Sequence, residues 1–180
     1  MKLINKETMG FVLRASGGFA RTCSAKLMPK QQDLWRHFFG ANPSDMVIAK
    51  SDIQPSKFPA LLPNLFMLGC IHNDQGQVVD LVVRLLGTKF VSLYGEFTGI
   101  KMLSDSKGCD FFSQNNLDKA TVLRVVNKIS DKRLPYFYRV RRENDTIQFE
   151  TRTFILPVAL GKGADVSFVF GCTDILRQTN

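Results

Sequence analysis

The sequence predicts an α+β protein, with one five-stranded antiparallel sheet, short helices on one face of it, and a flanking helix before the first strand. Two strand-like apolar runs, 64–72 and 77–86, precede the helical part of the chain. Three more strand-like runs follow it, over 135–142, 147–160 and 166–175, with short polar turns between them. Strands, then helices, then strands again is the order expected of an antiparallel sheet whose helices are gathered together.

The segment before the sheet divides near residue 28. We expect residues 1–28 to be a basic, flexible or loosely helical tail, and 29–180 to be a single domain of ordinary length. The tail shows no steady apolar period, whereas Leu34, Trp35 and Phe38 recur on one side of a predicted helix. Basic residues exceed acidic ones by five over the first thirty residues, out of a net charge of +8. The tail therefore carries most of the charge that favours nucleic acid, anionic lipid or an acidic partner.

Three glycines punctuate the stretch RLLGTKFVSLYGEFTG, residues 84–99. Gly87 ends the second strand, Thr88 is a good N-cap for a short helical turn, and Gly95 ends that turn. The spacing matches neither the dinucleotide-binding fingerprint nor the P-loop, so a phosphate-binding loop is excluded. We expect these glycines to let several short turns fold tightly over the sheet. Residues 116–130 follow as the most regular predicted helix.

Three longer stretches carry a resemblance. They are SDIQPSKFPALLPNLFMLG over 51–69, RLLGTKFVSLYGEFTGIKMLSD over 84–105, and FILPVALGKGADVSFVFG over 154–171. In this order they resemble the PAS domain family, and more closely its bacterial PAS_5 subgroup. The first is similar to an opening D-I-x-P-x-x-x-P-x-L-L-P. The second is similar to R-x-x-G-T followed by G-x-E-x-T-G, and the third to L-P-L with a glycine-bounded last strand.

The resemblance implies a sensory or signalling module that holds a small ligand between the sheet and the short helices, or that mediates protein contacts. The implied ligand-pocket candidates in this chain are Arg84, Tyr94, Phe97, Phe111, Tyr138, Phe154, Phe168 and Phe170. The aromatic members could equally fill a closed core, and Arg84 could instead pair with Glu96 or face solvent. The identity of a small organic ligand, and whether one is bound, stays open.

The resemblance also implies partners. PAS domains commonly associate through the helix before the first strand, so Leu34, Trp35 and Phe38 are the dimer-helix candidates for a homodimer. The chain stops shortly after the last predicted strand. We therefore expect no output domain here, and a separate signalling protein that reads the state of this one.

The residue types favour no cofactor, metal or catalytic site. His37 and His72 are predicted on a polar helix side and beside a turn, so neither favours a haem ligand. Cys109 sits in GCDFF, which does not resemble the N-C-R-F-L motif of flavin-binding PAS domains. No metal-ligand cluster and no nucleophile–base pair stands out, so we expect no enzyme. A catalytic α+β domain of the open-cone type would need an acid/base pair that this chain does not offer.

A basic nucleic-acid-associated regulator is the alternative function. Four arginines fall on neighbouring predicted strands among tyrosine and phenylalanine: Arg139, Arg141, Arg142 and Arg152. Such interleaving is typical of faces that bind single-stranded nucleic acid. Acidic residues nearby, Glu150 among them, would instead make this an ordinary solvated sheet surface.

The cysteines and the N-terminus bear on location. Four cysteines lie far apart without a C-x-x-C pair, which favours free thiols in a reducing cytoplasm. No apolar run approaches the ~18 residues of a membrane helix, and the N-terminus lacks the apolar region of a signal peptide. Its arginine-rich, acid-poor character also fits an organelle presequence, an alternative that stays open. We expect a cytoplasmic protein without membrane association.

Overall fold

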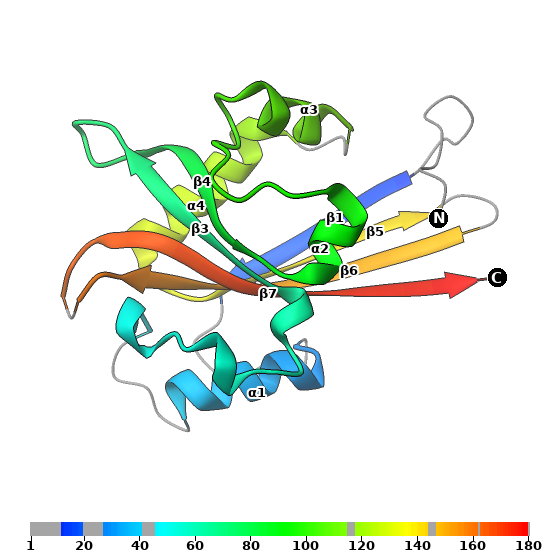
Figure 1. Ribbon diagram of the computed structural model, residues 1–180, viewed down its shortest axis with the longest axis horizontal. Helices are drawn as coiled ribbons and strands as arrows, with labels where there is room; N and C mark the ends of the chain where they lie inside the picture. Colours follow the sequence, from blue (N-terminus) through cyan, green and yellow to red (C-terminus); the bar gives the residue numbers. More distant parts are fainter. Residues whose placement is uncertain are drawn as a thin grey trace.

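The structure is a computed structural model that describes residues 12–19, 27–40, 46–114, 118–143, 147–161 and 163–179. Over these ranges the chain forms one sheet with helices on both of its faces (Figure 1). The α-helices described there are α1 (Pro29–Phe39), α2 (Thr88–Tyr94), α3 (Ser106–Gln114) and α4 (Lys119–Lys132).

The sheet contains seven strands within the described ranges: β1 (Val12–Phe19), β2 (Ile48–Ala49), β3 (Leu65–His72), β4 (Val78–Leu86), β5 (Tyr136–Glu143), β6 (Ile147–Ala159) and β7 (Val166–Thr179). Six of them lie in the order β1-β5-β6-β7-β3-β4, and every neighbouring pair in this order is antiparallel. The short β2 pairs parallel with the end of β6. The five predicted strands are β5, β6, β7, β3 and β4, so the α+β class and its antiparallel sheet are confirmed.

Strand β1 corrects the expectation for the N-terminal segment. The sequence predicts a flexible or loosely helical tail over 1–28, but Val12–Phe19 pair with β5 along its whole length. Edge pairing uses backbone groups, which need no apolar period in the sequence. Gly17 permits the close approach, because a Cβ there would collide with the Tyr136 side chain. The other residues of the predicted tail, except Leu27 and Met28, lie outside the described ranges.

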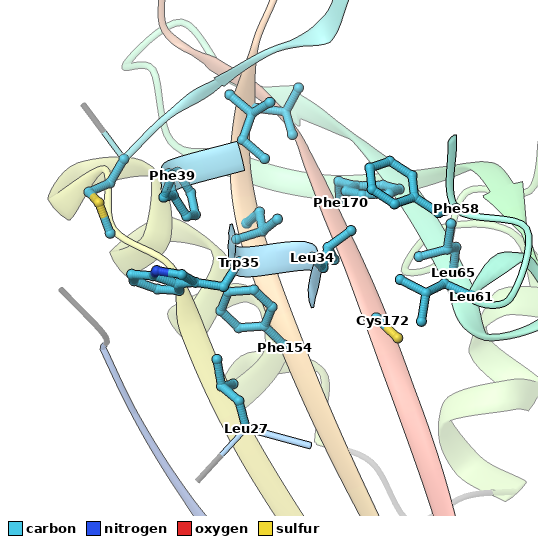
Figure 2. Close-up of a cluster of buried hydrophobic side chains, with 14 residues drawn as sticks. Leu27, Leu34, Trp35, Phe39, Phe58, Leu61, Leu65, Phe154, Phe170 and Cys172 are labelled. Carbon is cyan, nitrogen blue, oxygen red and sulfur yellow. The ribbon is translucent and has the colours of Figure 1, made fainter. Parts of the chain in front are cut away.

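Successive residues of a strand point to opposite faces, and each face of this sheet has its own core. We call the core under α1 the outer core. Its buried members are Leu27, Leu34, Trp35, Phe39, Met46, Ile48, Phe58, Leu61, Leu65, Phe154, Leu156, Val158, Phe170 and Cys172. Figure 2 shows Trp35 reaching from α1 to Phe154 of β6, with ring centroids 5.9 Å apart.

Helix α1 is also held to the sheet by a buried polar side chain. Gln31 is 1% exposed, and its Nε2 donates to the carbonyl oxygens of Arg152, at 2.8 Å, and Cys172, at 3.3 Å. Its Oε1 accepts a hydrogen bond from the backbone N–H of Met28, just before the helix. These bonds satisfy the buried amide and fix where α1 begins on the sheet.

The opposite face carries what we call the inner core, under α2, α3 and α4. Its buried members are Phe66, Val78, Leu81, Val83, Phe97, Met102, Phe112, Val126, Ile129, Ile155 and Val169. Figure 1 shows α3 and α4 on the side of the sheet away from α1. The predicted grouping of the short helices on one face is therefore confirmed, with α1 as the flanking helix on the other.

The edge strand β4 is covered by the segment that follows α2. The backbone N–H of Gly99 donates to the carbonyl of Val83 at 2.8 Å, and Lys101 forms a bridge with Val82. The buried carboxylate of Asp80 accepts from the backbone N–H of Leu103 at 2.9 Å. These bonds fix the start of α3 against the sheet edge.

Candidate functional site

The inner core is aromatic where α2 and α3 meet the sheet. Phe66 of β3 lies edge-on to Phe90 of α2, with ring centroids 5.9 Å apart, and Phe90 contacts Tyr94 at 6.5 Å. Phe111 of α3 meets Tyr94 at 5.2 Å and Phe97 at 5.4 Å, both in T-shaped geometry. T-shaped pairs are favourable because a positive ring edge meets a negative ring face. The five rings form a continuous aromatic layer that links the sheet to both helices.

A glycine in the sheet lets one of these rings approach closely. A Cβ at Gly171 of β7 would collide with the ring of Phe66 and would lie 2.7 Å from the carbonyl oxygen of Phe154. The phenyl ring therefore rests directly on the backbone of β7. Any larger residue at this position would push Phe66 out of the aromatic layer.

Two buried hydroxyls interrupt the apolar surface of the same face. Thr153 of β6 and Thr173 of β7 are opposite each other in register, 5% and 7% exposed, with their Oγ1 atoms 2.9 Å apart. Alternation along β6 places Thr153 on the face of Ile155, which belongs to the inner core. Tyr138 of β5 is in register with Thr153 and packs against the same core. Because each hydroxyl can donate one hydrogen bond and accept two, the pair can also bond a further polar group.

The aromatic layer and the threonine pair define the candidate site. Of the eight ligand-pocket candidates, the structure brings four to this face: Tyr94, Phe97, Phe111 and Tyr138. Phe97 is fully covered and Tyr94 is exposed at its outer end. The site therefore runs from a buried polar pair in the sheet to a tyrosine at the surface.

Three further candidates lie on the opposite face, so the structure does not bring them into this site. Phe154 and Phe170 are fully buried in the outer core, and Phe168 packs against that core with Lys50 Nζ 4.6 Å from its ring. The two-residue period of a strand separates them from Ile155 and Val169, which do face the inner core. The ligand-pocket candidates were chosen by residue type. Because alternation along each strand was not taken into account, they include residues from both faces of the sheet.

Arg84 also lies on the side of the outer core. Its Nε is 3.2 Å from where a Cβ on Gly69 would lie, and Gly69 shares its face of β3 with Leu65 of the outer core. A register shift between β3 and β4 at this point leaves Arg84 exposed. It faces solvent, and none of the described ion pairs joins it to Glu96. Glu96 instead accepts hydrogen bonds from Thr98, first its hydroxyl and then its N–H, which hold the pKa of Glu96 below its ordinary value.

The dimer-helix candidates are engaged within their own chain. Leu34 and Trp35 are 0% and 1% exposed, and they point into the outer core (Figure 2). Phe38 packs against Phe58 at 5.6 Å and Phe170 at 6.2 Å. Leu34 and Trp35 are therefore covered within their own chain, whereas Phe38 is half-buried. The exposed side of α1 carries Lys30, Asp33, Arg36 and His37.

The proposed nucleic-acid face is partly neutralised. Arg139 Nη2 lies 2.7 Å from the carboxylate of Glu150, and Arg152 pairs with the same carboxylate. Arg152 also contacts the Met28 sulfur, at 3.1 Å, beside the start of α1. The side chains of Arg141 and Arg142 lie outside what the structure describes. Two of the four arginines are thus bound to a carboxylate within the sheet, which argues against a continuous cationic strip.

The histidines show no metal-binding arrangement. His37 packs edge-on against Phe38 at 4.9 Å and Phe58 at 4.6 Å, on the side of the outer core. His72 is half-buried at the end of β3. In the part of the chain that the structure describes, no three His, Cys, Asp or Glu residues are grouped to hold a metal ion.

Sequence reasoning missed the threonine pair and helix α3. Alternation along β6 places Thr153 on the face of Ile155, but the pairing of Thr153 with Thr173 depends on strand register, which the pattern of a single strand does not give. Helix α3 was missed because the segment is short and Gly108 lies in its first turn. The glycine is required there, since a Cβ would lie 2.5 Å from the Met102 carbonyl oxygen.

The fold and the helix-covered sheet face define a PAS-like sensory domain. The family model of the PAS domain, PAS_5, matches residues 30–173. Because this match covers most of the chain, the protein belongs to the PAS_5 family of PAS domains. No curated protein and no solved structure matches the chain. PAS domains are in general sensory rather than catalytic, which agrees with a signalling role.

None of the helices in the described ranges is long and apolar enough to cross a bilayer.

Proposed function

We propose that this PAS domain senses a small, largely apolar molecule that binds between the inner face of the sheet and helices α2 and α3. The observation that carries the proposal is the Thr153–Thr173 pair, buried on the face that the aromatic layer covers. Ligand sites are mostly apolar, with a few fixed polar groups that orient the ligand. A pair of hydroxyls on this face suits a ligand with a single hydroxyl or carbonyl group.

The aromatic layer gives binding a route to the helices. Phe90 and Tyr94 belong to α2 and Phe111 to α3, and their rings are in sequential contact. A ligand that displaces Phe90 from Phe66 would therefore shift both helices together. The shifted helices would present a changed surface to a separate signalling protein. We further propose a cytoplasmic location, which the free thiols of Cys70, Cys109 and Cys172 support in the described chain.

The first test is native mass spectrometry of the freshly purified protein. We expect a non-covalent added mass on the wild type and its loss from the double variant Thr153→Val/Thr173→Val. Valine keeps the shape of threonine and removes both hydroxyls, so neither is left buried without its partner. The matched control is Thr88→Val, which changes an exposed threonine of α2 and should retain the added mass.

The proposal would be contradicted by wild-type protein that carries no added mass and whose melting temperature no small apolar compound raises. That result would favour a closed core and a domain that acts through protein contacts alone. If the double variant retained the ligand as well as the wild type does, the ligand would bind without the threonine pair, at another part of the protein.

A further inference from the structure

A cysteine and a lysine form a close pair where α3 meets α4, away from the residues of the proposed ligand site. Lys119 Nζ, in the first turn of α4, donates to Cys109 Sγ of α3 at 2.8 Å. Both side chains also point at one backbone oxygen, that of Leu103. Cys109 Sγ donates to it at 3.2 Å and Lys119 Nζ at 3.1 Å. The three groups form a closed triangle that holds the sulfur and nitrogen in contact.

We propose that Cys109 and Lys119 are an oxidation-dependent cross-link site, at which a hydroperoxide joins sulfur to nitrogen and ties α3 to α4. The inference does not depend on the proposed ligand. A sulfenic acid condenses with a backbone nitrogen to form a sulfenamide. A neutral lysine amine is a stronger nucleophile than a backbone amide, so it can take the same role when it is held next to the sulfur. The observed contact meets that condition.

The chemistry balances with hydrogen peroxide as the sole oxidant. The Cys109 thiol first releases its proton to water. The thiolate then attacks one peroxide oxygen, the O–O bond breaks, and the departing hydroxide takes a proton from the Lys119 ammonium. The products are Cys109 sulfenic acid, neutral Lys119 amine and water. The amine nitrogen then attacks the sulfur, the S–O bond breaks, and the hydroxyl leaves with an amine proton as a second water. The resulting S–N bond is reduced again by thiols, which return a free thiol and a free amine.

The other described cysteines are poorly placed for this reaction. Desolvation raises the pKa of the Cys70 thiol to about 12 and that of the Cys172 thiol to about 12, so both stay protonated near neutral pH. Oxidation by peroxide requires the thiolate. Cys109 is half-buried at the protein surface, and Cys23 lies outside the described residues. Among the described thiols, Cys109 is therefore the expected site of attack.

The test is peptide mapping by mass spectrometry after brief treatment of the whole protein with hydrogen peroxide. In the wild type we expect one linked peptide pair joining Cys109 to Lys119, lighter than the two peptides together by two hydrogen atoms and released by dithiothreitol. In Lys119→Arg, which keeps the positive charge, we expect no such pair. A sulfenic-acid trap such as dimedone should instead label Cys109 several-fold more in this variant than in the wild type.

Lys128→Arg is the matched control, because Lys128 is an exposed lysine of the same helix. It should form the cross-link as the wild type does. The proposal is overturned if Cys109 of the wild type is labelled by dimedone as strongly as in Lys119→Arg, or if it proceeds to sulfinic acid without a linked peptide. It is equally overturned if Cys109 stays reduced while another cysteine is oxidised.

Discussion

Single side chains decide how the helices of this domain begin. Asp118 caps α4, and its carboxylate accepts hydrogen bonds from the backbone N–H groups of Ala120, at 3.2 Å, and Thr121, at 2.9 Å. The Thr121 hydroxyl, first, and its N–H lower the pKa of Asp118 below its ordinary value. Helix α4 therefore begins at Lys119, within the helix predicted over residues 116–130.

The lowered pKa of Asp118 predicts a pH-dependent stability. The contribution of the charged cap is complete above the ordinary pKa of aspartate, about 3.9, and is lost as the pH falls through the lower folded-state value. Asp118→Asn keeps a capping side chain without the charge. We therefore expect a melting temperature below the wild type at pH 7, and a gap between the two that narrows below about pH 4. Thermal denaturation monitored by circular dichroism over this pH range checks it, and a constant gap would contradict the assigned role.

Among the predicted site residues, the sequence indicated the right residue types but not their faces. Phe97 and Phe111 belong to the inner core, whereas Phe154 and Phe170 belong to the outer core. All four are large, aromatic and buried or half-buried, so composition cannot separate them. The face of a strand residue follows from its parity relative to a neighbour of known orientation, and that reference came only with the structure.

At the scale of elements, apolar periodicity predicted most helices and strands, whereas the elements at the edges of the sheet were missed. Helix α1 and strands β3 to β7 lie within a few residues of their predicted bounds, because each presents a clear apolar pattern. Strand β1 lacks such a pattern, and helix α3 is short, with Gly108 in its first turn. The first is held by backbone pairing to β5, and the second is positioned by the cover of the β4 edge. Both depend on partners far along the chain, which local sequence does not specify.

The placement of helix α1 against the sheet can be tested by substituting one buried and one exposed residue of the helix. Because Trp35 is buried against Phe39 and Phe154, Trp35→Ala should destabilise the fold by ~3–5 kcal/mol through lost burial and a cavity. Arg36→Ala, on the exposed side of the same helix, should change the free energy of unfolding by less than about 0.5 kcal/mol. Urea denaturation measures both values. Near-equal values, or a Trp35 variant that changes only the oligomeric state on a sizing column, would restore the dimer-helix interpretation.

At the scale of the molecule, one sheet supports two cores. Phe154 and Ile155 are consecutive residues of β6, yet one belongs to the outer core and the other to the inner core. Val169 and Phe170 of β7 divide in the same way. Neither core can open without exposing strands that the other also needs, so the two are mechanically joined through the backbone of the central strands.

This arrangement predicts a single cooperative unfolding transition. Trp35, the only tryptophan of the chain, reports on the outer core by its fluorescence. Cys70 packs against the inner core and reports on it through its reactivity with a thiol reagent, read in a Cys23→Ser/Cys109→Ser/Cys172→Ser background. We expect the two probes to give the same urea midpoint, as two-state unfolding requires. Different midpoints would show that the outer core and the inner core unfold independently.

The arginine pairs of the sheet lead to a prediction about the alternative function, nucleic-acid binding. Since Glu150 pairs with both Arg139 and Arg152, we expect no shift of single-stranded DNA on a gel at moderate salt. Binding that weakens steeply with added salt would instead support the alternative, with the N-terminal basic residues or Arg141 and Arg142 as its source.

The two edge strands of the sheet, β1 and β4, differ in how their outer backbone groups are paired. Beyond β4, hydrogen bonds from the chain itself occupy the backbone of Val83, whereas beyond β1 no strand is paired in the described residues. Among the described residues, pairing of a further strand is therefore blocked at Val83 of β4, whereas β1 is the edge with no described neighbour on its outer side.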